Sequence, residues 1–415
     1  MSGFFARPGF APFRVRDFSL FFLSRFQSGL ASQMINVAVG WLIYDLTGSA
    51  LSLGLVGLAI FVPNLVFILA AGHVADRYER RKVLIACYTI LTLASMGLFV
   101  GVAMNRLTPG LIYALVGLLG TARAFSSPAS SALLPNIVPR DIFARAVALN
   151  SSANQVSVII GPALGGLIYG GLLSAAFKGA YAVFLLASLL FIACIVCLLL
   201  MKPRQGAALH SKVTWENVTA GFRFIRTNQI LLGTISLDLF AVLLGGATAL
   251  MPIFAKDIFH TGPAGLGLLR SAPAVGAVFT AFALAYFNMN RKVGLRMFQA
   301  VAVFGLATIG FGLSSNMYLA MFFLACLGAA DMVSIYIRST LVQIETPDEM
   351  RGRVSAVNSV FIGASNELGE FESGVLAHLT GPVVAVVFGG VGTLGVTALW
   401  MKLFPELRRR DTLDS

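Results

Sequence analysis

Apolar residues occur in long runs along this chain, and short polar segments separate the runs. Many runs approach twenty residues, which is the length of helix needed to cross a hydrocarbon layer about 30 Å thick. A segment inside a bilayer must satisfy its own backbone hydrogen bonds, so the runs predict helices. A transmembrane barrel would instead show short strands of alternating polarity. The pattern therefore predicts an all-α integral membrane protein.

We predict twelve transmembrane helices. Composition agrees with this, because 57% of the 415 residues are hydrophobic and only 12% are charged. A soluble domain carries about 25% charged residues. The predicted spans cover residues 18–44, 51–71, 83–104, 109–133, 143–173, 180–201, 230–255, 264–287, 296–314, 317–342, 353–377 and 382–403.

The second half of the chain repeats the first. The stretch VPRDIFARAVALNS at 138–151 aligns with TPDEMRGRVSAVNS at 346–359, at an offset of 208 residues. The spans therefore predict two pseudo-symmetric six-helix bundles, an arrangement typical of transporters that bind substrate near the bilayer midplane. We divide the chain into an N-terminal bundle at 1–201, a cytoplasmic linker at 202–229, a C-terminal bundle at 230–404 and a cytoplasmic tail at 405–415.

The linker contains one amphipathic segment. Its helical spacing gathers Trp215, Val218, Phe222 and Ile225 on one side. Such a helix is expected to lie on the cytoplasmic membrane surface. A helix that docks a partner is the alternative.

The positive charge of the chain follows its predicted topology. The net charge is +12, and 23 of the 30 basic residues fall on one side of the predicted spans. Positive loops stay in the cytoplasm, so both termini are expected there, in the bacterial inner membrane. This distribution explains the charge without a nucleic-acid partner.

Two motifs that resemble cofactor or metal sites lie inside apolar spans. Cys194-x-x-Cys197 has no second pair of ligands, and GVGTLG at 390–395 has no strand before it. Buried thiols and close helix packing explain these motifs better. We therefore expect no metal site, no cofactor and no enzymatic activity.

The loop GHVADRYERRKVL at 72–84 holds the densest charge cluster of the chain. It resembles motif A of the major facilitator superfamily, with Glu79 where that family usually has glycine. Segments FLSRF, ADRYERRKV, AGFRF and ETPDEMRGR resemble the enterobactin exporter family in order and spacing. The resemblance implies two six-helix bundles, alternating access and proton-coupled efflux. Its gating residues would be Gly72, Asp76, Arg77, Arg80, Arg81 and Lys82.

Motif A is expected to act as a latch on the cytoplasmic side. Asp76 can face the start of the helix near Thr346 and pair with Arg351 or Arg353. Thr346 is expected to cap that helix, with Pro347 at its first position. The alternative is that these residues are only positive-inside charges, which leaves the position of Asp76 unexplained.

A second motif lies on the fifth span, in SVIIGPALGG. It resembles motif C of antiporters in the same superfamily, with Ser157 where that pattern has a glycine. The motif residues are expected to let this helix approach a neighbour across the interface of the two bundles. They are Gly161, Pro162, Gly165 and Gly166.

Charged residues inside the spans are the candidate functional residues. Each costs roughly 2.5–3.5 kcal/mol at a helix centre, so such residues are rare and usually functional. The repeat relates Arg123 to Asp331 at the offset of 208, and Arg25 to Asp238 at an offset of 213. We expect these opposite charges to face one another across the pseudo-twofold axis. For Arg25 and Arg338, reaching out to the cytoplasmic interface is an alternative.

The most acidic intramembrane stretch is NELGEFESG at 366–374. Glu367 and Glu370 are three residues apart and so share one helix face. Two neighbouring carboxylates titrate as a unit, which suits a site that binds and releases protons. Glu372 is expected to point elsewhere and pair with an arginine.

These observations favour a monomeric secondary transporter. Its expected partners are protons, the lipid bilayer and a small amphipathic substrate such as a siderophore, drug or metabolite, moved out of the cell. Uptake or lipid flipping by the same fold is one alternative. A membrane sensor or assembly subunit that does not transport is another.

Overall fold

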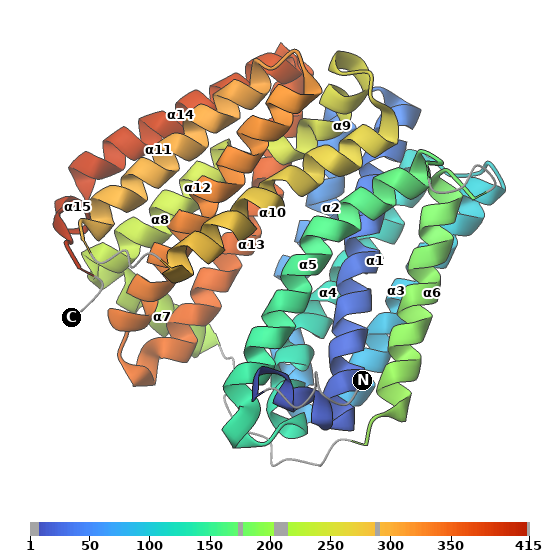
Figure 1. Ribbon diagram of the computed structural model, residues 1–415, viewed down its shortest axis with the longest axis horizontal. Coiled ribbons are helices and arrows are strands. Elements are labelled where there is room, and N and C mark those ends of the chain that lie inside the picture. The colour runs from blue at the N-terminus through green and yellow to red at the C-terminus, as the bar shows by residue number, and fades with distance from the viewer. Residues whose placement is uncertain (1–7, 173–176, 203–214, 287–290, 413–415) are drawn as a thin grey trace. The chain divides into compact units, whose positions relative to one another are not determined.

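The computed structural model describes residues 8–172, 177–202, 215–286 and 291–412 (Figure 1). Within these ranges the chain is helical and contains no strand. It divides into two units. Unit 1 comprises Met1–Leu42 and Val62–Val213, and unit 2 comprises Ile43–Phe61 and Thr214–Ser415. The break at 213/214 lies inside the linker that we predicted.

Two helices run through both units. They are α1, Arg16–Thr47, and α2, Ala50–Arg77. The turn between them contains Gly48 at φ +58°, a left-handed conformation that glycine adopts without steric cost. The rest of unit 1 contains η1 Pro8–Arg14, α3 Arg80–Ala103, α4 Pro109–Ile137, η2 Arg140–Ile142, α5 Phe143–Tyr169 and α6 Ala180–Leu200.

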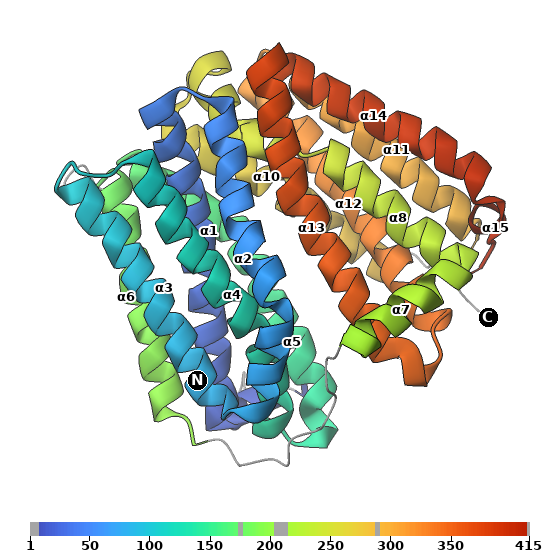
Figure 2. The ribbon, with the colours of Figure 1, turned by 180° about the vertical axis from the view of Figure 1, so that it is seen from behind.

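The rest of unit 2 runs from the linker helix to the C-terminal helices (Figure 2). At the start of several helices, one polar side chain accepts hydrogen bonds from backbone N–H groups of the first turn. Asn228, for example, accepts hydrogen bonds from the backbone of Ile230 and Leu231 at 3.0 and 3.1 Å. The elements are α7 Trp215–Thr227, α8 Gln229–Leu244, η3 Ala247–Leu250, α9 Met251–Ile253, η4 Phe254–Ile258, α10 Gly262–Tyr286, α11 Val293–Gly312, α12 Met317–Ile344, α13 Asp348–Thr380, α14 Pro382–Leu403 and α15 Pro405–Arg409.

The two units use the same packing between equivalent helices. In unit 1, α3 packs on α4 and α6; in unit 2, α11 packs on α12 and α14. Helices α11 and α14 lie side by side in Figures 1 and 2. The repeat seen in the sequence is therefore also a repeat of helix packing.

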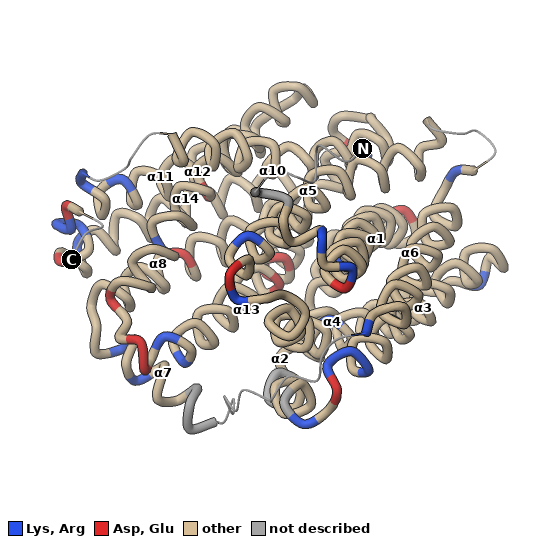
Figure 3. The backbone as a smooth tube through the Cα atoms, turned by 60° about the horizontal axis from the view of Figure 1, so that its bottom comes forward, with Lys and Arg blue, Asp and Glu red and all other residues tan. Residues whose placement is uncertain are grey.

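Nine described segments are long and apolar enough to cross a membrane. Helices α1, α5 and α13 are also long, at 32, 27 and 33 residues, but they are not among the nine. The multi-pass helical architecture is confirmed, whereas the number of twelve spans stays a prediction. Figure 3 shows how little of the chain is charged, with charged patches near α7, α13 and the C-terminus.

The amphipathic helix of the linker forms as α7. Ile225 is 2% exposed and packs in a cluster with Val354 and Val357 of α13, while the Phe222 ring lies 6.4 Å from that of Phe361. Ile225 therefore packs against α13, whereas Phe222 is 48% exposed, and the position of α7 on the membrane surface stays a prediction. The side chains of 215–218 and residues 203–214 lie outside the described part.

Candidate functional site: a buried charge cluster in unit 2

A buried ion pair joins α8 to α12. Arg338 Nη1 lies 2.6 Å from Asp238 Oδ2, and the two side chains are only 7% and 6% exposed. The guanidinium donates a hydrogen bond to the carboxylate at this distance. Of the two alternatives for Arg338, the structure excludes the one in which it reaches the interface, because its partner lies inside the unit.

A second carboxylate, Asp331, lies close to this pair. It precedes Arg338 by seven residues on α12, which is two helical turns and therefore the same face. Asp331 and Asp238 line one small cavity together with Ser334, and the charge of Asp331 interacts with both members of the pair. The other lining residues are Ala241, Val242, Val301, Phe304 and Ala330.

The cavity contains more acceptors than the pair can satisfy. Two carboxylates and one guanidinium carry a net charge of −1 when all are ionised. Among the described residues, the buried Ser334 Oγ has no hydrogen-bond partner. A net charge is costly in a cavity with apolar walls, so the group is suited to bind one small cation, and a proton is the smallest.

On α13, Glu370 has an arginine nearby as a counter-charge. Glu370 is close enough to Arg270 of α10 for their charges to interact. A Cβ placed on Gly57 of α2 would lie 3.1 Å from Glu370 Oε2 and 3.2 Å from the Glu367 carbonyl oxygen. Glu367 and Glu370 thus lie on the side of α13 that meets α2. The contact found for Glu372 is with Ser373, at 3.5 Å, where we had predicted an arginine.

The candidate arginines of unit 1 lie on α1 and α4. Arg123 donates to Asn36 Oδ1 at 3.3 Å. Arg25 acts electrostatically on Tyr88 and Cys194, and its Nε is buried with no hydrogen bond to a described residue. The predicted partners of these arginines belong to unit 2, so their pairing across the repeat stays a prediction.

The basic residues of motif A bind backbone carbonyls within unit 1. Arg80 donates to the Ala132 oxygen of α4 at 2.9 Å, and Arg81 donates to the Leu199 oxygen of α6 at 3.1 Å. Glu79, at the position where the motif has glycine, forms an exposed ion pair with Lys82 at 2.9 Å. Arg80 and Arg81 therefore tie the loop to α4 and α6.

The latch from Asp76 to α13 is not tested. The side chain of Asp76 lies outside the described residues, and α13 belongs to the other unit. The predicted start of α13, however, is wrong by one residue. The helix begins at Asp348, Pro347 is its N-cap, and Thr346 Oγ1 is buried without a partner in the described chain. Pro347 fits there because a cap residue needs no helical N–H.

The glycines of motif C face α1 within unit 1. A Cβ on Gly161 would lie 2.5 Å from Gln33 Cβ, and one on Gly165 would lie 2.9 Å from Met34 Cα. The prediction that they meet a helix of the other bundle is not tested by these contacts, which all lie within unit 1. Their neighbour is α1, with Pro162 and Gly166 also buried on α5.

Ser157 has a compensating partner in the same seam. Its hydroxyl donates to the Phe26 carbonyl of α1 at 3.2 Å, and a Cβ on Gly29 would lie 2.9 Å from that hydroxyl. The motif has a glycine on α5 where this chain has Ser157. The small residue at this contact is instead Gly29 of α1. The departure from motif C keeps the two helices close.

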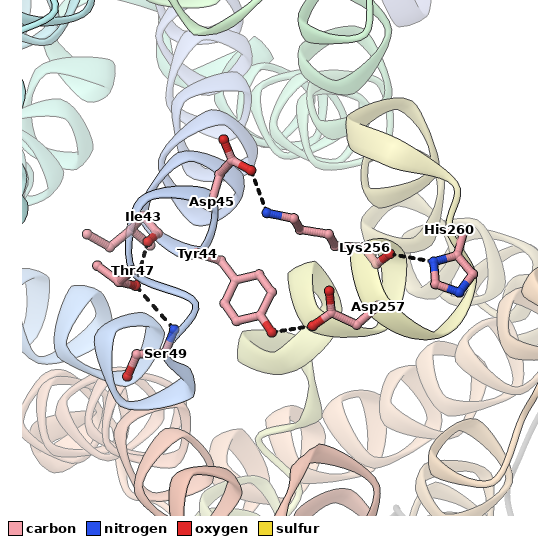
Figure 4. Close-up of polar contacts among 8 residues, drawn as sticks. All are labelled: Ile43, Tyr44, Asp45, Thr47, Ser49, Lys256, Asp257 and His260. Carbon is pink, nitrogen blue, oxygen red and sulfur yellow. Dashed lines mark hydrogen bonds and ion pairs between the residues drawn. The ribbon is translucent and has the colours of Figure 1, made fainter.

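A polar contact that we had not predicted joins the end of α1 to η4, both in unit 2 (Figure 4). The Tyr44 hydroxyl donates to Asp257 Oδ2, and Lys256 Nζ pairs with Asp45 Oδ1. The two halves occupy equivalent places in the sequence repeat, since Tyr44 and Asp257 are 213 residues apart, the offset that relates Arg25 to Asp238. The offset marks equivalent positions and does not by itself predict a contact.

Comparison with known proteins decides the family. The profile of the family described as transmembrane secretion effector, MFS_3, matches residues 7–415. The chain belongs to this family of major facilitator transporters.

Relatives of known name and solved structures agree with this assignment. The chain is 28% identical over 401 residues to proteins named enterobactin exporter EntS from Citrobacter koseri and Escherichia coli O81, covering 94% of this chain and 92% of each relative. A point mutant of the nucleoside transporter NupG has a similar fold, with a TM-score of 0.72, 15% identity and coverage of 94% and 100%. A bacterial homologue of ferroportin has a TM-score of 0.71 at 14% identity, with coverage of 95% and 99%.

Membership in the transmembrane secretion effector family confirms several predictions. The protein is a multi-pass transporter of the bacterial inner membrane that acts on small molecules, and it is not an enzyme. The resemblance to enterobactin exporters, first seen in four short segments, extends over nearly the whole chain.

Proposed function

We propose that this transporter exports a small amphipathic molecule of siderophore, drug or metabolite class from the cytoplasm, driven by protons moving inward. Both termini would lie in the cytoplasm, and a single chain would carry out the alternating-access cycle without a cofactor. Export is supported by the relatives named enterobactin exporter. The direction of the charge bias supports the orientation.

Proton coupling is supported above all by the cluster of Asp238, Asp331 and Arg338. With both carboxylates ionised, the cluster carries one negative charge in a cavity whose other walls are mostly apolar. One bound proton would neutralise it. Because Asp238 already holds Arg338 at 2.6 Å, we assign that proton to Asp331.

Protonation of Asp331 could be transmitted to the surrounding helices through this arrangement. Protonated Asp331 would leave the Asp238–Arg338 pair intact. Ionised Asp331 would draw Arg338 toward itself, because the guanidinium can pair with either carboxylate. Rearrangement of a buried arginine between α8 and α12 would then signal the protonation state to the helix packing of unit 2.

The experiment is accumulation of a probe in everted membrane vesicles that contain the protein. Respiration acidifies the interior of such vesicles, so an exporter driven by protons should concentrate its substrate inside them. Enterobactin and ethidium are suitable first probes, one a siderophore and one a cationic dye. Accumulation should disappear when a protonophore collapses the gradient.

The matched variants are Asp331→Asn and Asp141→Asn. The first removes the proposed proton site, whereas Asp141 is exposed in η2 and undergoes the same chemical change outside the cluster. We expect loss of accumulation only in Asp331→Asn. Accumulation that resists the protonophore, or that survives in Asp331→Asn, would contradict the proposal.

A further inference from the structure

The outer ends of α1 and α2 are held by unit 2, although both helices begin or continue in unit 1. Helix α1 passes into unit 2 between Leu42 and Ile43, and α2 returns to unit 1 between Phe61 and Val62. By sequence, residues 43–61 belong to the first repeat. Contacts with the rest of unit 2 must therefore hold residues 43–61.

One set of contacts is polar and is shown in Figure 4. Two consecutive residues of α1, Tyr44 and Asp45, meet two consecutive residues of η4, Lys256 and Asp257. The Lys256 ammonium also lies 5.7 Å from the centroid of the Tyr44 ring, within range of a cation–π contact. We call these four residues the outer lock.

The η4 half of the outer lock is firmly mounted on unit 2. Phe254 at its start is completely buried, and its ring lies 4.6 Å from that of Phe311 in α11. The segment forms a π-helical turn, with the Phe259 N–H bonded to the Phe254 oxygen at 2.8 Å. Such turns are rare and occur frequently at functional sites.

A second set of contacts holds the start of α2 against α13 through small residues. A Cβ on Gly374 would lie 2.7 Å from Gly54 Cα and 2.9 Å from the Ala50 oxygen. The two backbones therefore touch, with no side chain between them. Contacts of this kind separate without extracting a large side chain from a pocket.

Helix α2 has a built-in weak point beside the boundary between the units. Pro63 lies inside the helix, two residues after Phe61. Proline donates no backbone hydrogen bond and crowds the carbonyl four residues earlier, so helices bend at such positions. Residues 50–61 can thus change direction relative to the rest of α2.

From these observations we infer that the outer lock is a releasable clasp that holds residues 43–61 on unit 2 in one state of the transport cycle. On its release, residues 43–61 leave the rest of unit 2, and α2 changes direction near Pro63. The charge bias places the lock on the side opposite the cytoplasm. The inference does not depend on proton coupling or on the identity of the substrate.

The strength of the contacts suits repeated opening. The Lys256 and Asp45 side chains are 35% and 51% exposed, so their ion pair contributes little net stability. The Tyr44 side of the lock is more buried, since that residue is 8% exposed. Together these contacts favour the state in which residues 43–61 are held on unit 2, but they are weak enough to break repeatedly.

The test uses cysteine labelling of purified protein in lipid nanodiscs, where both membrane faces are accessible. Ala50 is 8% exposed beside Gly374, so Ala50→Cys reports release of the segment. The background carries Cys326→Ser, because Cys326 is partly exposed while Cys87, Cys194 and Cys197 are buried. The probe is a hydrophilic maleimide.

Lys256→Gln and Tyr44→Phe should each raise the labelling rate of the introduced cysteine about two- to tenfold, the range expected for losing one such contact. Arg106→Gln, an exposed basic residue of unit 1 on the same predicted side, should leave the rate unchanged. The exchange Asp45→Lys with Lys256→Asp should return the rate toward that of the intact lock.

Folded single variants with unchanged labelling would overturn the inference. An exchanged pair that labels faster than either single variant would also overturn it, because the two charges would then not be partners. The exchange guards against misfolding as an explanation, since a merely disrupted protein would not recover.

Discussion

Two of the ion pairs in the described part of unit 2 have nearly equal lengths but very different surroundings. Arg338 lies 2.6 Å from Asp238, and Lys256 lies 2.5 Å from Asp45. The first pair is almost completely buried, whereas the side chains of the second are 35% and 51% exposed. The distances alone would suggest that the two ion pairs contribute equally to stability.

The difference in burial separates their roles. Breaking a buried pair strands a charge at low dielectric and costs about 3–5 kcal/mol, whereas an exposed pair is worth about 0.2–1 kcal/mol. The buried Asp238–Arg338 pair is therefore strong enough for a protonation event beside it to have a lasting effect on the structure. The outer pair is suited to open and close in each cycle.

The largest effect is expected for Arg338→Gln. Removing the guanidinium leaves Asp238 and Asp331 together in the cavity, and we expect a loss of about 3–5 kcal/mol of stability. Reversible unfolding in detergent measures it. The double variant Asp238→Asn with Arg338→Gln should recover part of this loss. A double variant as unstable as the sum of the two single variants would argue against a direct pair.

Asp331→Asn should keep the fold but change the protonation state of the cluster. We propose that the cluster holds one proton at neutral pH, so infrared spectra of the wild type should contain a carbonyl band of a protonated carboxylic acid. The variant should lack this band. Its persistence in Asp331→Asn, with Asp141→Asn as the matched control, would assign the proton elsewhere.

Glu370→Gln should have a smaller effect on coupling than Asp331→Asn. Glu370 has Arg270 as an opposite charge nearby, so its own negative charge is compensated. We expect slower accumulation of the probe that still responds to the protonophore. The same measurement on Glu367→Gln extends the comparison. Complete loss of the response in both would restore our sequence-based assignment of the proton site to α13.

The smallest effect on stability is expected for Lys256→Gln, at below about 1 kcal/mol. Added salt should weaken this contribution further, because the pair is exposed to solvent. Unfolding measured at low and high salt, beside Arg338→Gln, tests both statements. A loss as large as that of Arg338→Gln would contradict the distinction between the two pairs.

Helix positions were predictable because hydrophobic runs mark them directly. The predicted spans 109–133 and 382–403 correspond to α4 at Pro109–Ile137 and α14 at Pro382–Leu403. Thr108 and Gly381 stand immediately before these helices. Local signals of this kind need no knowledge of tertiary packing.

The partners of the buried charges were not predictable in the same way. Asp238 and Arg338 are 100 residues apart, and only the rotation of α8 against α12 brings them together. The glycines of α5 illustrate the same limit, since their spacing predicts a close neighbour but does not say that it is α1. The outer lock depends on a π-helical turn, and no periodic pattern in the sequence predicts such a turn.

The central claim is that substrate export is coupled to a proton bound at Asp331. Proteoliposomes with a pH indicator inside allow proton movement to be followed while enterobactin or another transported probe is added. We predict substrate-dependent proton flux for the wild type and for Asp141→Asn, and none for Asp331→Asn. Proton flux with substrate at the wild-type ratio in Asp331→Asn would contradict the account.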